Sequence, residues 1–163
     1  MARCRDVSND LDFLPAGAAR PDNLKTRYVY KVVVDRIYDG DTVFLSFDLG
    51  LKTWVKNVPC RLYGIDTPEM RGIERPEGVL SRQELGRLCQ EHSVERYDKV
   101  GRLTDSLPPT LMAQTRKLRS GDDKAGKYGR WLVTLIGWDW ENGIPVNLND
   151  RLVASGHAAP YPL

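Results

Sequence analysis

The stretch YVYKVVVDRIYDGDTVFLSF, residues 28–47, decides the expected fold. Residues 28–35 are rich in β-branched and aromatic side chains, which favour a strand. Residues 39–41, Asp-Gly-Asp, are typical of a turn, and residues 42–47 then alternate apolar side chains on one face of a second strand. Residues 53–63 predict a third strand. Three strands joined by short turns indicate an antiparallel meander or the wall of a barrel.

The rest of the chain predicts two helices and two more strands. A helical pattern runs from residue 76 to about residue 98, and a shorter helix is expected over residues 147–155. Strands are expected at residues 110–115 and 131–138, with a polar loop at residues 119–129 between them. This order predicts a mainly β (α+β) protein, a small β-barrel with helices packed on it.

The composition is that of a globular protein. Of the 163 residues, 41% are hydrophobic and 28% are charged, which excludes a disordered or fibrous chain. The longest apolar stretch is far shorter than the roughly 18 residues of a membrane helix. Three cysteines without CxxC spacing argue against disulfides or zinc, and Cys60 and Cys89 are expected to be small buried hydrophobes. We expect residues 1–26 to form a flexible lead-in and residues 27–163 to form one domain.

Carboxylates stand at the ends of neighbouring predicted strands. Asp41 follows the first turn, and Asp66 follows the third strand. Two such side chains, with a backbone carbonyl near Thr67 and water, suit a hard divalent cation such as calcium. Glu69, just beyond Asp66, can face the same cleft and orient or deprotonate a water. Asp39 is expected to be a turn residue and not a ligand.

Two arginines complete a chemical set. Arg61 and Arg130 carry planar guanidinium groups, which match the geometry of a phosphate. The net charge of the chain is only +2, but residues 110–130 hold six basic and two acidic side chains, which predicts a phosphate-binding edge sensitive to salt. A cation, a carboxylate that positions water and two arginines are the parts needed to hydrolyse a phosphodiester.

Four segments, in this order, resemble the staphylococcal nuclease (thermonuclease) family. They are Asp-Gly-Asp-Thr at residues 39–42, Arg with Asp-Thr-Pro-Glu at residues 61–69, Lys-Tyr-Gly-Arg at residues 127–130 and a closing segment at residues 146–161. The resemblance implies a five-stranded OB-fold-type β-barrel with packed helices. It also implies an enzyme that cleaves DNA and RNA with calcium (Ca2+), breaks the bond to the 5′ oxygen and leaves 3′-phosphate ends.

The resemblance also implies a role for nine residues. Three are calcium ligands, namely the Asp41 and Asp66 side chains and the main-chain carbonyl of Thr67. Three are catalytic, namely Arg61 and Arg130 on the scissile phosphate and Glu69 as the candidate general base. Three are further substrate contacts, namely Lys127 and Tyr128 on another phosphate and Tyr161 beside a base.

The sequence departs from the family pattern in three places. Gly126 stands where the family often has an aspartate, the stretch between Glu69 and Arg130 is longer, with the extra length near residues 92–109, and no long C-terminal helix follows Tyr161. These departures bear on substrate preference and quaternary structure more than on the chemistry. A second hypothesis also stays open, a catalytically weak module of the same fold that binds nucleic acid or a protein. Because all five acidic and arginine side chains are present, the nuclease is favoured.

The expected partners are DNA and RNA, with single-stranded or locally unwound strands favoured and no membrane. We expect a monomer or a weak oligomer. The N-terminal residues carry charges where a signal peptide has its apolar stretch, so no export signal is expected. The location is expected to be cytoplasmic or else stays open, because relatives are often secreted. The preference between DNA and RNA stays open.

Overall fold

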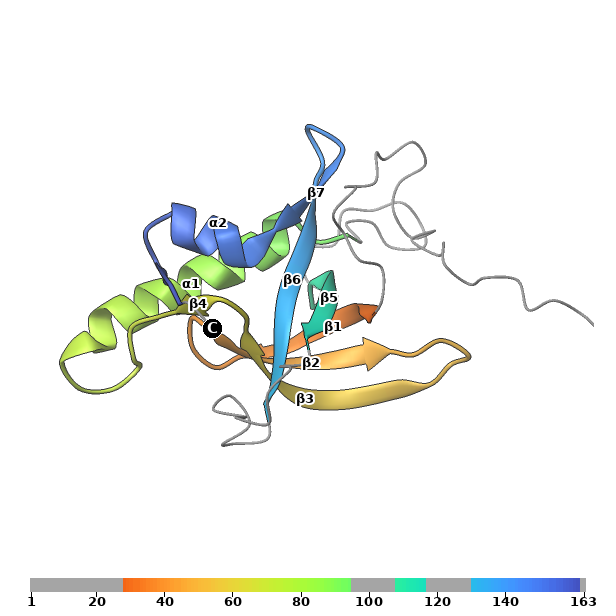
Figure 1. Cartoon of the computed structure of the whole chain (residues 1–163), viewed down its shortest axis with the longest axis horizontal. Coiled ribbons are helices and arrows are strands. Elements are labelled where there is room, and N and C mark those ends of the chain that lie inside the picture. The colour runs from red at the N-terminus through yellow and green to blue at the C-terminus, as the bar shows by residue number, and fades with distance from the viewer. Residues whose placement is uncertain (1–27, 95–107, 117–129, 162–163) are drawn as a thin grey trace, which may run out of the picture.

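The strands and helices of the computed structural model, which describes residues 28–94, 108–116 and 130–161, follow the predicted order (Figure 1). The strands are β1 (Val29–Ile37), β2 (Thr42–Asp48), β3 (Trp54–Leu62), β4 (Ile65–Asp66), β5 (Thr110–Arg116), β6 (Trp131–Asp139), β7 (Ile144–Asn147) and β8 (Ala159–Pro160). The helices are α1 (Arg75–Glu91) and α2 (Leu148–Ala154), and a 3-10 turn, η1 (Gly72–Glu74), precedes α1.

Five of the strands form a closed barrel. Antiparallel pairing gives the order β3-β2-β1-β5-β6, and parallel pairing between β3 and β6 joins the two edges. Closure pairs backbone groups that an open sheet would leave exposed at its edges. β7 continues the sheet beyond β6. The protein is therefore mainly β with two helices and an OB-fold-like barrel, which confirms the predicted fold class.

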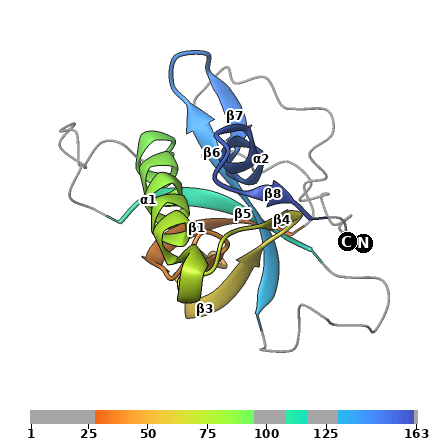
Figure 2. The ribbon, with the colours of Figure 1, turned by 90° about the vertical axis from the view of Figure 1, so that its left-hand side faces the viewer.

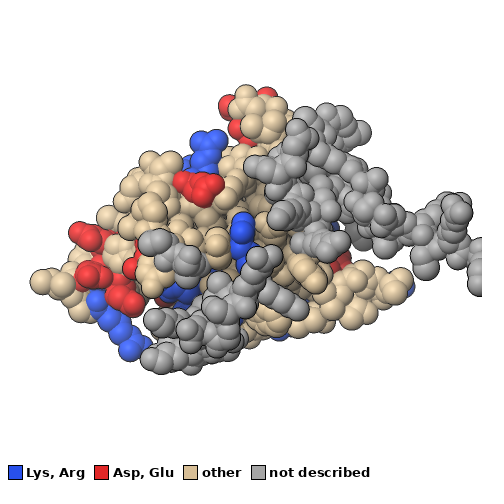
Figure 3. Space-filling view, in the orientation of Figure 1, with Lys and Arg blue, Asp and Glu red and all other residues tan. Residues whose placement is uncertain are grey.

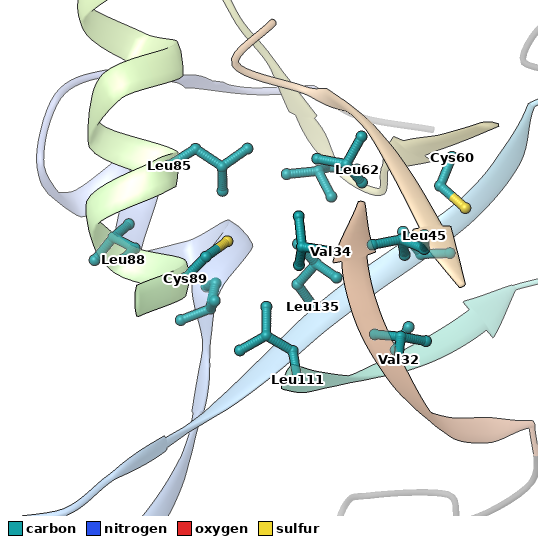
Figure 4. Close-up of a cluster of buried hydrophobic side chains, with 14 of the residues drawn as sticks. Val32, Val34, Leu45, Cys60, Leu62, Leu85, Leu88, Cys89, Leu111 and Leu135 are labelled. Carbon is teal, nitrogen blue, oxygen red and sulfur yellow. The ribbon is translucent and has the colours of Figure 1, made fainter. Parts of the chain in front are cut away.

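The hydrophobic core lies between the barrel wall and α1. Alternate strand residues such as Val32 and Leu45 point inward and belong to one cluster with Leu85 of α1 (Figure 4). Cys60 and Cys89 are fully buried in the same cluster, and burial raises the pKa of both thiols to about 12. Both therefore stay protonated and pack as small hydrophobes, as predicted.

α1 ends earlier than its sequence pattern predicts. The helix was expected over residues 76–98, but its last residue is Glu91, and residues 95–98 lie outside the described part of the chain. Immediately after the helix, the carbonyl of His92 accepts a hydrogen bond of 2.8 Å from the backbone N of Trp138 in β6. The strand thus takes a carbonyl that a further helical turn would have used.

Three short strands are absent from the sequence-based prediction. β4 and β8 have two residues each, which is too short for a periodic pattern, and β7 contains Pro145. β4 and β8 pair with each other beside α1 and α2, which lie together at one end of the barrel (Figure 2). Neither α1 nor α2, the helices of the described ranges, is long and apolar enough to cross a membrane.

Asn149 in α2 joins the end of β3 to β6. Its Oδ1 accepts a hydrogen bond from the backbone N of Leu135 at 3.1 Å. Its Nδ2 donates to the carbonyls of Tyr63 at 2.9 Å and Val133 at 3.2 Å. Asn149 is buried, so the bonds to Leu135 and Val133 are shielded from water, and the bond to Tyr63 is partly buried. The three bonds hold the closing strands together.

We expect Asn149→Ala to lower the free energy of unfolding by about 2–4 kcal/mol, because the Leu135 N–H and the Tyr63 and Val133 carbonyls lose a side-chain hydrogen-bond partner in the protein interior. Asn142→Ala, which removes an exposed turn contact to Asp139, is the matched control and should change it by less than about 1 kcal/mol. Chemical denaturation of both variants measures the difference. Equal losses would contradict a joining role for Asn149.

Candidate functional site

The turn between β1 and β2 is shaped by the Asp39 side chain. Asp39 Oδ1 accepts hydrogen bonds from the backbone N of Asp41 at 3.1 Å and of Thr42 at 2.6 Å. Asp39 is therefore a turn residue, as the sequence predicts. Asp41 is only 4% exposed, and its Oδ1 accepts a hydrogen bond of 3.0 Å from Thr42 Oγ1. The turn thus holds one carboxylate below the surface in a fixed orientation.

Arg61 lies between the two carboxylates predicted to bind metal. The β2–β3 register places it opposite Thr42. Its Nη1 lies 2.9 Å from Asp41 Oδ2, and its Nη2 donates to Asp66 Oδ1 at 2.8 Å. Asp41 and Asp66 therefore converge on one guanidinium group, which agrees with their expected place at neighbouring strand ends.

Arg130, which directly precedes β6, also contacts the segment formed by this turn and the start of β2. The parallel register pairs Cys60 with Trp131, so the residue before β6 lies next to the end of β3. Arg130 Nη1 donates to Thr42 Oγ1 at 3.0 Å. The two arginines are far apart in the sequence, yet both contact the segment that carries Asp41.

A cavity of about 550 Å³ lies around these groups. It is lined by five of the predicted site residues, namely Asp41, Arg61, Thr67, Glu69 and Arg130. Asp66 lines an adjoining cavity of about 370 Å³, and the two cavities share Thr67 and Pro68. Five of the nine predicted residues thus line one cavity, and the sixth, Asp66, contacts one of them, Arg61.

Of the three predicted substrate contacts, the structure describes only Tyr161, which does not line this cavity. Tyr161 follows β8, where its backbone N donates to the carbonyl of Gly64 at 2.9 Å, and it is not among the residues that line the cavity. Its side chain is 48% exposed. Lys127 and Tyr128 lie outside the described residues. The roles of all three remain predictions.

Burial dominates the electrostatics of Asp41. It raises the pKa of this carboxyl from 3.8 to about 7, while the nearby charge of Arg61 acts in the opposite direction. Further acidic side chains gather where α1 begins, with basic side chains beside them (Figure 3). Glu69, Glu74 and Glu77 are exposed in this region. The site is thus rich in oxygen atoms that could bind a cation. The ionised form of one of these groups, the Asp41 carboxylate, is stabilised by a nearby positive charge.

The oxygen atoms of the site suit a hard cation when a main-chain carbonyl and water are counted with the two carboxylates. Among the described residues, no three acidic, histidine or cysteine side chains are grouped to hold a metal ion. A cation bound by Asp41 and Asp66 would need further oxygens, which the Thr67 carbonyl and water can provide. Arg61 contacts both carboxylates, so it competes with a cation for them.

The cavity is also lined by residues that no sequence motif indicated as site residues. They are Arg36, Tyr38, Phe44, Pro59, Met70 and Arg71. Strand alternation is a signal that places Phe44 on the same face as Thr42. The same alternation predicts the wrong face for Arg36, because a register shift between Val34 and Arg36 changes the face on which later β1 residues lie.

Close packing at two glycines positions the loop after β4. A Cβ on Gly40 would lie 2.9 Å from the Cβ of Thr67, and a Cβ on Gly78 would lie 2.6 Å from the carbonyl oxygen of Glu69. Only a residue without a side chain allows these approaches. The turn that carries Asp41 and the first helical turns of α1 thereby hold Thr67 and Glu69 at the cavity.

We expect Gly78→Ala to destabilise the protein by about 1–3 kcal/mol, because backbone of the Glu69 loop must move to admit a methyl group. Gly86→Ala, on the same helix, meets only Ile37 Cδ1 at 3.7 Å and should be neutral or stabilising by up to about 1 kcal/mol. Thermal unfolding compares the two. Faster amide exchange at residues 69–71 in Gly78→Ala alone would locate the effect, and equal behaviour of both variants would contradict it.

The raised pKa of Asp41 predicts a pH-dependent stability in the presence of a chelator. Between about pH 4 and 7 the folded state keeps a proton on Asp41 that the unfolded state releases, so this contribution to stability is lost as the pH rises through about 7. Relative to the wild type, Asp41→Asn should therefore gain stability from pH 4 to pH 8, by up to about 4 kcal/mol. Denaturation at both pH values tests this, and a difference that does not change with pH would contradict it.

The comparisons with known proteins identify no family for this chain. No family model and no curated protein matches the sequence. The likeness to the staphylococcal nuclease family therefore rests on the four short segments and their order. The chemistry of the side chains that meet at Arg61 is therefore the basis for a proposed function.

Proposed function

We propose that this chain is a calcium-dependent nuclease of the staphylococcal nuclease type, which hydrolyses phosphodiester bonds in DNA, RNA or both. One observation carries the proposal. Arg61 contacts Asp41 and Asp66 together, at the cavity that Arg130 and Glu69 also line. Two arginines suit a phosphate, and the carboxylates suit a cation beside it.

In this proposal Asp41, Asp66 and the Thr67 carbonyl hold calcium. Calcium held there would supply positive charge near the phosphoryl oxygens. Release of the Asp41 and Asp66 oxygens by Arg61 frees its guanidinium for the substrate phosphate. Arg61 then stabilises the transition state without leaving the site.

Arg130 binds a second oxygen of the same phosphate. Its contact with Thr42 fixes one Nη group, so the guanidinium is already oriented towards the turn that carries Asp41. Planar guanidinium groups from two directions restrain the phosphate and leave one face of the phosphorus open to attack.

Glu69 orients a water and accepts its proton as the oxygen attacks phosphorus. The bond from phosphorus to the 5′ oxygen breaks in line, and that oxygen takes up a proton as it leaves. The products are a 3′-phosphate and a 5′-hydroxyl. An exposed carboxylate at the cavity wall has access to water, which this role requires.

The proposed substrate extends beyond the scissile phosphate. Lys127 and Tyr128 bind a neighbouring phosphate, and Tyr161 lies beside a base. Because these contacts and the basic segment at residues 110–130 act on the nucleic-acid backbone, binding weakens as salt is added. Unpaired strands of DNA and RNA are the proposed partners of an enzyme that acts as a monomer or a weak oligomer.

We expect Arg61→Ala to lower the rate of oligonucleotide cleavage at least about a hundredfold, because a transition-state donor is lost. The same variant should bind calcium several-fold more tightly, because a cation that competes for Asp41 and Asp66 is gone. Cleavage of a labelled single strand and calorimetric titration with calcium measure the two effects. Glu69→Gln should lose cleavage and keep its calcium affinity.

Arg87→Ala is the matched control, because Arg87 also contacts two carboxylates, those of Glu84 and Glu91, on the surface of α1. It should change neither cleavage nor calcium binding. Undiminished cleavage in a chelator would contradict the metal mechanism. Tight binding without cleavage by the wild type in any divalent metal would favour the binding module.

A further inference from the structure

A row of three side chains crosses the outer face of the barrel beside the candidate site. Arg36 of β1 pairs with Phe44 of β2, and Phe44 pairs with Pro59 of β3. All three line the same cavity as Arg61 and Arg130. β1, β2 and β3 lie side by side in this wall (Figure 1). The row thus belongs to the surface that a bound phosphodiester would cross.

A β-bulge places Arg36 on this outer face. Val32 and Val34 point into the core, so regular alternation would direct Arg36 inward too. The register shifts between Val34 and Arg36, and the extra residue, Asp35, accepts a hydrogen bond of 2.7 Å from Ser46 Oγ. Bulges often re-aim a side chain next to a functional site, and this one turns an arginine towards the cavity.

Arg36 is held over an aromatic ring. Its Cζ lies 4.2 Å from the centre of the Phe44 ring and 5.9 Å from that of Tyr38. Arg36 and Tyr38 are exposed, and within the described ranges no carboxylate forms an ion pair with Arg36. The guanidinium is therefore supported on Phe44, while its positive charge is not offset by an ion pair there.

We propose that Arg36, Tyr38, Phe44 and Pro59, here called the stacking shelf, bind an unpaired nucleobase of the nucleotide next to the scissile phosphate. This inference rests on the proposed nuclease function and adds a surface that would bind a base of the unpaired strands proposed above. Guanidinium planes and aromatic rings are the surfaces on which proteins stack unpaired bases.

The spacing of residues along β2 supports this position for the base. Thr42, which pairs with Arg61 and contacts Arg130, lies two residues before Phe44 on the same face of β2. Two residues of a strand span about 7 Å, so the shelf begins one side-chain row away from the phosphate-binding arginines. A base in a duplex is covered by its neighbours on both faces, so only an unpaired base can lie flat on the shelf.

The shelf also predicts weak discrimination among bases. Phe44 and Pro59 offer no side-chain hydrogen bond to a base edge, and every base has a flat face for Arg36 or Tyr38. Stacking on this surface distinguishes paired from unpaired strands more than it distinguishes sequences.

The test compares binding of two labelled strands of equal charge, an eight-residue oligothymidine and an abasic strand of the same length, to the protein with Glu69→Gln in calcium. We expect the oligothymidine to bind about tenfold more tightly. Phe44→Leu and Arg36→Lys should each reduce this ratio to about twofold or less, while binding of the abasic strand is kept. Thermal melts check that both variants fold.

Trp54→Leu and Lys56→Arg are matched controls, because Lys56 Nζ lies 4.4 Å over the Trp54 ring on β3 without lining the cavity. Both should keep the tenfold ratio. An equal affinity of the wild-type shelf for the two strands would overturn the proposal. Equal weakening of both strands by Arg36→Lys would also overturn it, because Arg36 would then contact phosphate.

Cleavage assays separate failure of the shelf from failure of the nuclease. In a background with Glu69 intact, Phe44→Leu should slow cleavage of a single strand about tenfold and leave cleavage of a duplex unchanged. A protein that binds bases on the shelf but never cleaves would refute the nuclease and support the shelf. Normal cleavage with no preference for the base-bearing strand would refute the shelf alone.

Discussion

The parallel hydrogen bonding between β3 and β6 is the interaction on which both the barrel and its site depend. It converts a row of antiparallel strands into a closed wall, and it sets the position of the residue that precedes β6. Arg130 reaches Thr42 because Trp131 pairs with Cys60. Asn149 supports this closure from α2 with three hydrogen bonds, of which two are buried and one is partly buried. Fold and site are therefore specified by the same register.

The buried Asp41 shows how the site balances its charges. Desolvation of this carboxyl is unfavourable, and the Arg61 guanidinium, which it shares with Asp66, offsets part of that penalty. In the proposed nuclease Arg61 has two alternative anionic partners, the carboxylates in one state and a substrate phosphate in the other. A cation at the carboxylates would favour the second state, which couples metal binding to the availability of the arginine.

Local sequence signals predicted most of the fold and the centre of the site. β-branched runs located β1 and β2, and the Asp-Gly-Asp turn located Asp41, because both depend on residues that are close in the chain. The end of α1 was missed because His92 bonds to a strand more than 40 residues away. Arg36 was missed because the bulge at Asp35 reverses its face, and that shift depends on pairing with β2. Tertiary pairing, absent from local patterns, accounts for both differences.

The closing pair of strands also has a consequence for the order of folding. Arg61 and Leu132 pair across about 70 residues, whereas β1, β2 and β3 follow one another through short turns. Loop-closure entropy delays distant contacts, so the hairpins are favoured to form first and β6 docks late. A chain that has formed only the hairpins can bring Arg61 to Asp41, but it lacks Arg130. Arg61, Asp41 and Arg130 are therefore expected to come together only once β6 has docked.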